Sequence, residues 1–177
     1  MKTYIAFLRG INVGGHKKIP MAELRGILMA EGLKKVTTYI QSGNVIFTSE
    51  EEPNSLALKI SEAIQNHFGF KVPVLMVSPE TLQYVFNACP FPKEKKKNSY
   101  FSLLYTIPDE ASIIEISNIS YPNEEIMVTK SCVYFYASAG YARTKFNNNF
   151  FENKLKVTAT ARNYKTMLKL LSLLAEY

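Results

Sequence analysis

Cysteine, histidine, aspartate and tryptophan are all scarce in this chain of 177 residues, which has two Cys, two His, one Asp and no Trp. Cys89 and Cys132 form no CxxC pair and are too few for a disulfide framework, so we expect reduced thiols in a cytoplasmic protein. The scattered His and Cys residues predict no metal site. A Ser-His-Asp arrangement would depend on Asp109, which a predicted helix start already explains.

Long apolar runs are also missing. Residues 4–8 are too short for the core of a secretory signal, and the run at residues 167–174 is interrupted by Lys169 and Ser172. No stretch approaches the roughly 20 apolar residues that a membrane helix needs. We therefore expect no membrane partner, while the oligomeric state stays open.

Positive charge is concentrated in one part of the chain. The net charge is +6, and residues 141–170 contain seven Lys and Arg against one acid, Glu152, so this segment accounts for the whole excess. Concentrated charge of this kind indicates an anionic partner, such as a phosphate-bearing small molecule, a nucleic acid or an acidic protein. The alternative is a solvated basic face without a ligand.

The pattern of residues 1–78 predicts a βαββαβ unit. Strands are expected at residues 4–8, 36–41, 44–48 and 72–77, which have apolar or alternating composition. A Ser-Gly turn joins the second strand to the third, and two amphipathic helices end at Gly32 and Gly69. This is the order of a ferredoxin-like unit, with an antiparallel sheet and both helices on one face.

The rest of the chain repeats this order less clearly. After a helix that begins near Ser78, residues 93–97 are predicted to be a charged loop and residues 158–161 a connector. Between and after them, strands are expected at 98–106, 126–129 and 132–137, and helices at 108–116, at 150–155 and after a cap near residue 163. The sequence therefore predicts an α+β fold of two ferredoxin-like units in tandem, residues 1–78 and 79–177, the second incomplete or modified, packed as one compact body.

Residues 9–20, RGINVGGHKKIP, form the first candidate site. The spacing of the outer glycines matches a P-loop, but the Lys and the Ser or Thr that should follow are missing. The functional interpretation is a looser anion nest, in which the backbone N–H groups of Gly14 and Gly15 act with Lys17 or Lys18. The alternative is a purely structural loop.

Two further segments carry polar candidates. Gln41 and Asn44 flank the Ser-Gly turn, where they either orient a ligand through their amides or only serve the turn. Arg162 and Asn163 precede the last helix, where a guanidinium can hold a phosphate or carboxylate with two hydrogen bonds. A capped helix with surface charge is the alternative there.

The βαββαβ order also suggests RNA recognition as an alternative function, in which aromatic side chains on the sheet stack on bases. Tyr4, Phe7 and Phe47 are the aromatic candidates on the central strands. The RNP1 pattern is not met, however, and Phe47 alone is better explained as a core residue.

Three segments, FLRGINVGGHKKIPMAELRGIL, TYIQSGNVIF and TATARNYKTMLKLL, together resemble the DUF1697 family of uncharacterised, mainly bacterial proteins. The resemblance covers essentially the full length, although Tyr164 stands where the family typically has Trp. It implies a duplicated ferredoxin-like organisation and supplies no activity. It also implies that twelve residues belong together: Arg9, Gly10, Asn12, Gly14, Gly15, Lys18, Gln41, Ser42, Gly43, Asn44, Arg162 and Asn163.

These observations predict binding of an anionic, phosphate-containing ligand at the glycine loop. The first loop and the late Arg–Asn pair are expected to face one groove. The alternative is nucleic-acid binding through residues 141–170. No nucleophile–base pair can be argued, so no reaction and no cofactor is assigned. The predicted ligand-binding residues are Arg9, Gly10, Asn12, Gly14, Gly15, Lys17, Lys18, Gln41, Asn44, Arg162 and Asn163.

Overall fold

The computed structural model describes residues 1–177, and the chain divides into two compact units. Unit 1 comprises Met1–Leu82 together with the last five residues, Leu173–Tyr177, and unit 2 comprises Gln83–Ser172. The division predicted from the sequence lay after residue 78 and left the last residues in the second unit. Unit 1 is therefore built from both ends of the chain.

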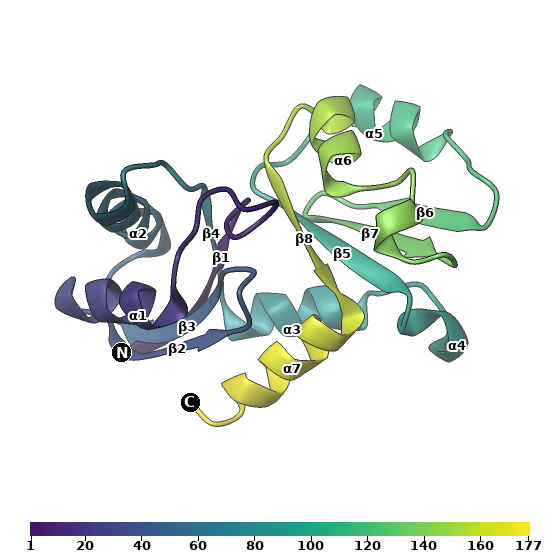
Figure 1. Ribbon diagram of the computed structural model, residues 1–177. Coiled ribbons are helices and arrows are strands. Elements are labelled where there is room, and N and C mark those ends of the chain that lie inside the picture. The colour runs from purple at the N-terminus through teal and green to yellow at the C-terminus, as the bar shows by residue number, and fades with distance from the viewer. The chain divides into compact units, whose positions relative to one another are not determined.

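Unit 1 has the predicted βαββαβ order (Figure 1). Its elements are β1 (Lys2–Leu8), α1 (Met21–Ala30), β2 (Lys34–Tyr39), β3 (Asn44–Ser49), α2 (Pro53–Phe68) and β4 (Val74–Val77). The strands form one antiparallel sheet in the order β2-β3-β1-β4. This order confirms a ferredoxin-like unit. The turn between β2 and β3 spans residues 40–43, so it is longer than the predicted Ser-Gly turn.

Both helices of unit 1 pack on one face of its sheet, as predicted. α1 buries Leu24 and α2 buries Ile60 in one core with Tyr4 and Phe47 of the central strands. Each fully buried Leu, Ile or Phe stabilises the fold by roughly 1.5–3 kcal/mol. Phe7, on the other face, is also fully buried. These aromatic side chains therefore do not offer the exposed stacking platform that RNA recognition by this sheet would need.

Unit 2 repeats the same topology. The chain continues through α3 (Pro79–Asn87), α4 (Lys93–Lys96), β5 (Ser99–Leu104), α5 (Glu110–Ser117), β6 (Glu124–Val128), β7 (Cys132–Ala137), the 3-10 helix η1 (Tyr141–Arg143), α6 (Asn148–Leu155), β8 (Ala159–Asn163) and α7 (Tyr164–Leu174). The sheet order β6-β7-β5-β8 corresponds strand by strand to that of unit 1. Figure 1 shows α5 and α6 on the same side of this sheet. The α+β fold with two ferredoxin-like units is therefore confirmed.

Two sequence predictions about unit 2 are wrong. Residues 158–161 were predicted to be a connector, but β8 runs antiparallel to β5 here and completes the sheet, so the second unit is not incomplete. Thr160 and Arg162 are buried polar residues of this strand. Its Ala and Asn residues are also uncommon in strands, so no sequence pattern marks it. Residues 93–97 were predicted to be a loop but begin with the short helix α4, for which Pro92 is the N-cap.

Unit 2 buries both faces of its sheet. On one face, Phe135 of β7 packs edge-on against Phe151 of α6, with 5.0 Å between the ring centroids. On the other face, the hydroxyl of Tyr134 donates a 2.8 Å hydrogen bond to the carbonyl of Val85 in α3. Neither face is therefore an open platform. No helix in the chain combines the length and apolar character needed to cross a membrane.

Candidate functional site

The first candidate site, residues 9–20, connects β1 to α1 in unit 1. The backbone N–H of His16 donates to the carbonyl of Val13 at 3.0 Å, across a tight reversal. Gly14 and Gly15 at its tip have φ values of 57° and 78°. Positive φ at both central positions is typical of a type I′ turn, which glycine adopts without strain. The segment is therefore a small hairpin with an exposed tip, which we call the glycine hairpin.

Asn12 holds the base of the glycine hairpin. Its Nδ2 donates to the carbonyls of Ile19 at 3.1 Å and Gln41 at 2.9 Å, and its Oδ1 accepts from the N–H of Ile19 at 2.8 Å. The backbone N–H of Asn12 donates to the carbonyl of Lys17 at 3.1 Å. Asn12 has a φ of 54°, a left-handed value that Asn tolerates better than most residues. One side chain thus ties the hairpin to the β2–β3 turn.

The glycine hairpin segment carries Arg9, Lys17 and Lys18, and it contains no Asp or Glu. Lys17 Nζ donates to the carbonyl of Lys71 at 3.0 Å and lies 6.0 Å from the centre of the Phe70 ring. Lys18 is exposed, and its ammonium makes no hydrogen bond or ion pair. No local pattern marks the partner of Lys17, because 54 positions separate the two residues. Positive charge at the exit of the hairpin is therefore not balanced within the segment.

The β2–β3 turn lies beside the hairpin through its contact with Asn12. Gln41 is exposed and contributes its backbone carbonyl to that contact. Asn44 is fully buried, and its Nδ2 donates to the carbonyl of Tyr39 at 2.9 Å and to Ser42 Oγ at 3.0 Å. Both amide hydrogens of Asn44 are therefore used to stabilise the turn.

Arg162 and Asn163 lie at the end of β8 in unit 2. Arg162 is 6% exposed, and its Nη1 donates to Thr160 Oγ1 at 2.7 Å and to the carbonyl of Ala161 at 2.8 Å. Asn163 Oδ1 accepts from the N–H of Thr166 at 2.8 Å, so it caps α7 as predicted. The pair belongs to unit 2 and the glycine hairpin to unit 1, so a common groove for them stays a prediction.

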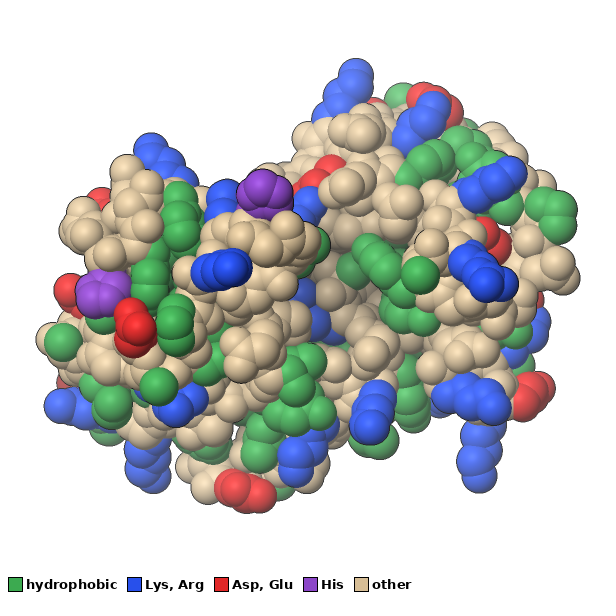
Figure 2. All heavy atoms as spheres, in the orientation of Figure 1, with side chains coloured by type: hydrophobic (Ala, Val, Ile, Leu, Met, Phe, Trp, Pro, Cys, Tyr) green, Lys and Arg blue, Asp and Glu red, His purple; other side chains and the backbone are tan.

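The cations of residues 141–170 have different environments. Lys154 pairs with Glu115 of α5 at 2.9 Å, and the buried Arg162 donates to its own strand. In Figure 2 the Lys and Arg side chains are dispersed over the visible face and do not gather into one stripe. Lys154 and Arg162 are therefore already engaged within the protein, and nucleic-acid binding through this segment stays a prediction.

Few groups have the properties of a nucleophile or a base. Burial raises the pKa of the Cys89 thiol and, more strongly, the pKa of the Cys132 thiol, so both free thiols are protonated near neutral pH. The hydroxyl and the N–H of Ser112 donate to Asp109 at the start of α5, and these hydrogen bonds lower its pKa. No group of three His, Cys, Asp or Glu side chains is placed to hold a metal ion.

Comparisons with known proteins agree with this architecture. The family model described as "Protein of unknown function (DUF1697)" matches residues 1–134. No curated protein gives a significant match. Among solved structures, a conserved bacterial protein from Streptococcus pneumoniae is 26% identical to the chain, with a TM-score of 0.75 over 97% of this chain and 98% of that one. The likeness therefore extends over both units.

Proposed function

This chain belongs to the DUF1697 family, whose function is unknown, and we propose that it binds a phosphate-containing anion at the glycine hairpin. The backbone N–H groups of Gly14 and Gly15 hold the anion, and the ammonium of Lys18 supplies the charge, with a further contribution from Lys17. Gln41, exposed on the neighbouring turn, orients the rest of the ligand. The ligand is a small molecule, and the proposal includes no reaction.

The observation that carries this proposal is the pre-organised state of the hairpin. Asn12 fixes its base with three side-chain hydrogen bonds, so the segment is already ordered before a ligand arrives. The N–H groups of Gly14 and Gly15 make no hydrogen bond within the protein and belong to exposed residues. Free N–H groups beside a cation are the elements that an anion needs.

The other predicted residues enter the proposal in different ways. Asn12 and Asn44 hold the hairpin and the turn in place and need not touch the ligand. Arg9 and Gly10 connect β1 to the hairpin, and Arg9 also fixes the backbone by donating its N–H to the carbonyl of Pro73 at 3.0 Å. We place this function in the cytoplasm, where two free thiols stay reduced.

Thermal shift and calorimetric titration with inorganic phosphate, sugar phosphates and nucleotides test the proposal. We expect at least one of these anions to raise the melting temperature saturably. Lys18→Ala should weaken the binding of that anion about tenfold or more, because a hydrogen bond to a charged group contributes roughly 1.5–3 kcal/mol. Lys34→Ala is the matched control, since Lys34 is exposed on β2 of the same unit and its side chain has no partner. Equal binding by the two variants, or no shift with any anion, would contradict the proposal.

The nucleic-acid alternative is decided in the same experiment by an oligonucleotide arm. Binding through several phosphates weakens steeply as salt is raised, because condensed counterions are released. A response to oligonucleotides alone, with a steep salt dependence and no effect of Lys18→Ala, would favour residues 141–170 over the glycine hairpin.

A further inference from the structure

Corresponding corners of the two units are built differently. In unit 1 the corner consists of the α1–β2 connection, residues 31–33, and the β3–α2 connection, residues 50–52. In unit 2 it consists of the α5–β6 connection, residues 118–123, and the β7–α6 connection, residues 138–147. The two corners correspond because the strand orders of the two sheets match. The longer second connection in unit 2 gives its corner a different surface.

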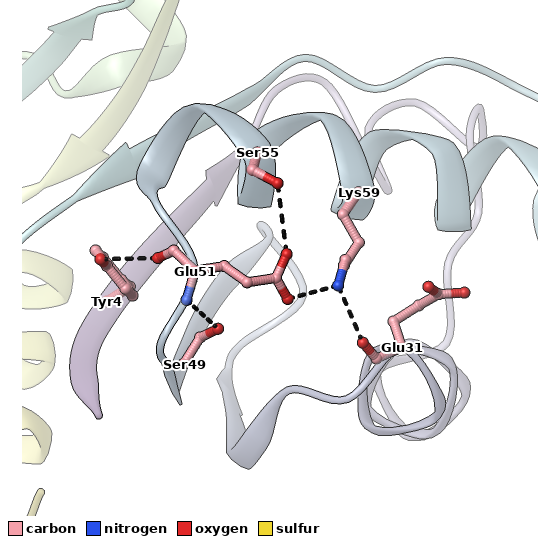
Figure 3. Close-up of polar contacts among 6 residues, drawn as sticks. All are labelled: Tyr4, Glu31, Ser49, Glu51, Ser55 and Lys59. Carbon is pink, nitrogen blue, oxygen red and sulfur yellow. Dashed lines mark hydrogen bonds and ion pairs between the residues drawn. The ribbon is translucent and has the colours of Figure 1, made fainter.

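At the corner of unit 1, the ammonium of Lys59 is paired with groups of the same unit (Figure 3). Lys59 of α2 donates to Glu51 Oε1 at 2.5 Å and to the carbonyl of Glu31 at 3.5 Å. The hydroxyl of Ser55 donates to the other carboxylate oxygen of Glu51 at 3.4 Å. The positive charge is therefore paired inside the protein, and the corner has no need of an external anion.

The corner of unit 2 encloses a cavity of about 320 Å³ with two cations at its wall. Arg143 is exposed, and its guanidinium makes no hydrogen bond or ion pair. The ammonium of Lys145 lies 4.9 Å from the centre of the Tyr121 ring and likewise forms no ion pair. Asn123 and Ser138 add polar side chains to the lining. The volume suits a small ligand, since pockets for such ligands start near 300 Å³.

Glu124 is the one acid in the lining, and its oxygens are already used. Oε2 accepts from Thr144 Oγ1 at 2.6 Å and from the N–H of Phe146 at 3.0 Å, and Oε1 accepts from the N–H of Lys145 at 2.9 Å. Glu124 thus shapes the cavity wall by holding residues 144–146 and makes no salt bridge with either cation. With two cations and one carboxylate, the lining of the cavity has a net positive charge.

We propose that this cavity binds the oxyanion group of a small ligand, at a site separate from the glycine hairpin. The guanidinium of Arg143 holds two oxygens with parallel N–H groups, a geometry that phosphate and carboxylate share. The ammonium of Lys145 and the hydroxyl of Ser138 donate to the remaining oxygens. A single excess positive charge favours a singly charged oxyanion, because a second negative charge would meet the carboxylate of Glu124.

Titration of the full chain with inorganic phosphate near pH 6, where the monoanion predominates, tests this site by amide NMR, and sodium acetate forms a second arm. We expect saturable shifts at residues 138–145 in at least one arm, with the half-saturation concentration raised about tenfold or more in Arg143→Ala. Arg143→Ala is expected to fold, because the side chain is exposed and has no partner. Lys130→Ala, an exposed change at the opposite end of the same sheet, should leave the titration unchanged.

The same titration separates this site from the proposed function. Lys18→Ala should leave the shifts at residues 138–145 intact even if it abolishes binding at the glycine hairpin. Shifts that rise linearly without saturation in both arms, or an unchanged half-saturation concentration in Arg143→Ala, overturn the second site. Shifts confined to residues 9–20 overturn it as well and leave the proposed function standing.

Discussion

At position 43 the surrounding residues leave no room for a side chain, so glycine is required there. Gly43 has a φ of 83°, and a Cβ at this position would lie 2.6 Å from the Cβ of Leu8 and 3.0 Å from Cδ1 of Ile11. Gly43→Ala should lower the free energy of unfolding by about 2–5 kcal/mol. The left-handed conformation costs a residue with a side chain about 1–2 kcal/mol, and overpacking costs roughly 1–3 kcal/mol more. Urea unfolding followed by circular dichroism measures the loss.

Gly15→Ala is the matched control for this prediction. Gly15 has a similar φ of 78°, but no atom lies within 4 Å of the position of an added Cβ. Only the conformational cost of about 1–2 kcal/mol should therefore appear. Equal losses in the two variants would show that the close approach to Leu8 does not contribute.

The carboxyl of Glu124 is expected to make the stability of unit 2 depend on pH. Partial burial raises the pKa of this carboxyl. Hydrogen bonds from Thr144 and from the backbone of Phe146 and Lys145, together with the positive charge of Lys145, outweigh burial, so the pKa lies below its ordinary value of 4.5. A carboxyl with a lowered pKa stabilises the folded state above its unfolded pKa, and this stabilisation is lost as the pH falls through the folded pKa. Glu124→Gln should therefore cost about 1 kcal/mol at pH 7, a figure kept small because solvent screens the group.

Unfolding at a series of pH values checks this prediction. The stability difference between wild type and Glu124→Gln should shrink as the pH falls below 4.5, since the wild-type carboxyl then takes up a proton as well. Glu62→Gln, an exposed change on α2 with no side-chain partner, should show no such trend. A difference between Glu124→Gln and wild type that stays constant with pH would mean that the carboxylate charge is not what holds residues 144–146.

Among the secondary-structure elements, β3, α2 and α1 are joined by one ion pair. Glu51 follows β3 and accepts from Lys59 of α2, which also reaches the end of α1. The two side chains are only 38% and 29% exposed, so solvent screens them less than a surface pair. A double-mutant cycle of Glu51→Ala and Lys59→Ala should give a coupling free energy of about 0.5–1 kcal/mol, measured by thermal or urea unfolding.

The pair Lys2–Glu52 provides the comparison within the same unit. Its atoms lie 3.3 Å apart, but the side chains are 63% and 74% exposed. The same cycle applied to this pair should give a coupling free energy near zero, because water and salt screen the charges of exposed side chains. A coupling as large as that of Glu51 and Lys59 would show that burial does not decide the strength of these pairs.

The elements also show what the sequence predicted and where it stopped. Amphipathic spacing and the stops at Gly32 and Gly69 predicted the first two helices, because these signals are local. The strand β8 was missed because its burial depends on pairing with β5, which no local pattern records. The candidate site was likewise predicted only where its signals are local. Gly14, Gly15 and the lysines stood out by composition, whereas the bond between Asn12 and Gln41 spans 29 positions and is visible only in the fold.

For the whole molecule, the duplication explains why one fold carries two different surfaces. Both units use the same strand order, and this shared framework fixes where the connections emerge. The connections themselves are free to differ, because loops are not bound by the packing of the core. The charge excess of residues 141–170 did predict that the second unit is basic, but only the fold separates Arg143 from cations such as Lys154 that already have a partner.

Tyr177, the last residue of the chain, forms hydrogen bonds with strand β2 of unit 1. Strand β2 is irregular between Lys34 and Thr37, where its register to β3 shifts, and Lys35 has a φ of 50°. The hydroxyl of Tyr177 donates to the carbonyl of Lys35 at 2.6 Å and lies 2.6 Å from Thr37 Oγ1. It thus satisfies a carbonyl at a bulge in an edge strand, where the ladder is interrupted.

Tyr177→Phe should therefore lower the stability of unit 1 by about 1 kcal/mol, the value of one such hydrogen bond. Amide hydrogen exchange gives the sharper test, because exchange should become faster in β2 while β5 of the other unit keeps its protection. Tyr84→Phe is the control, since Tyr84 is 72% exposed and its hydroxyl has no partner. Equal exchange in β2 for both variants would mean that the bulge is held by β3 alone and that unit 1 does not need the end of the chain.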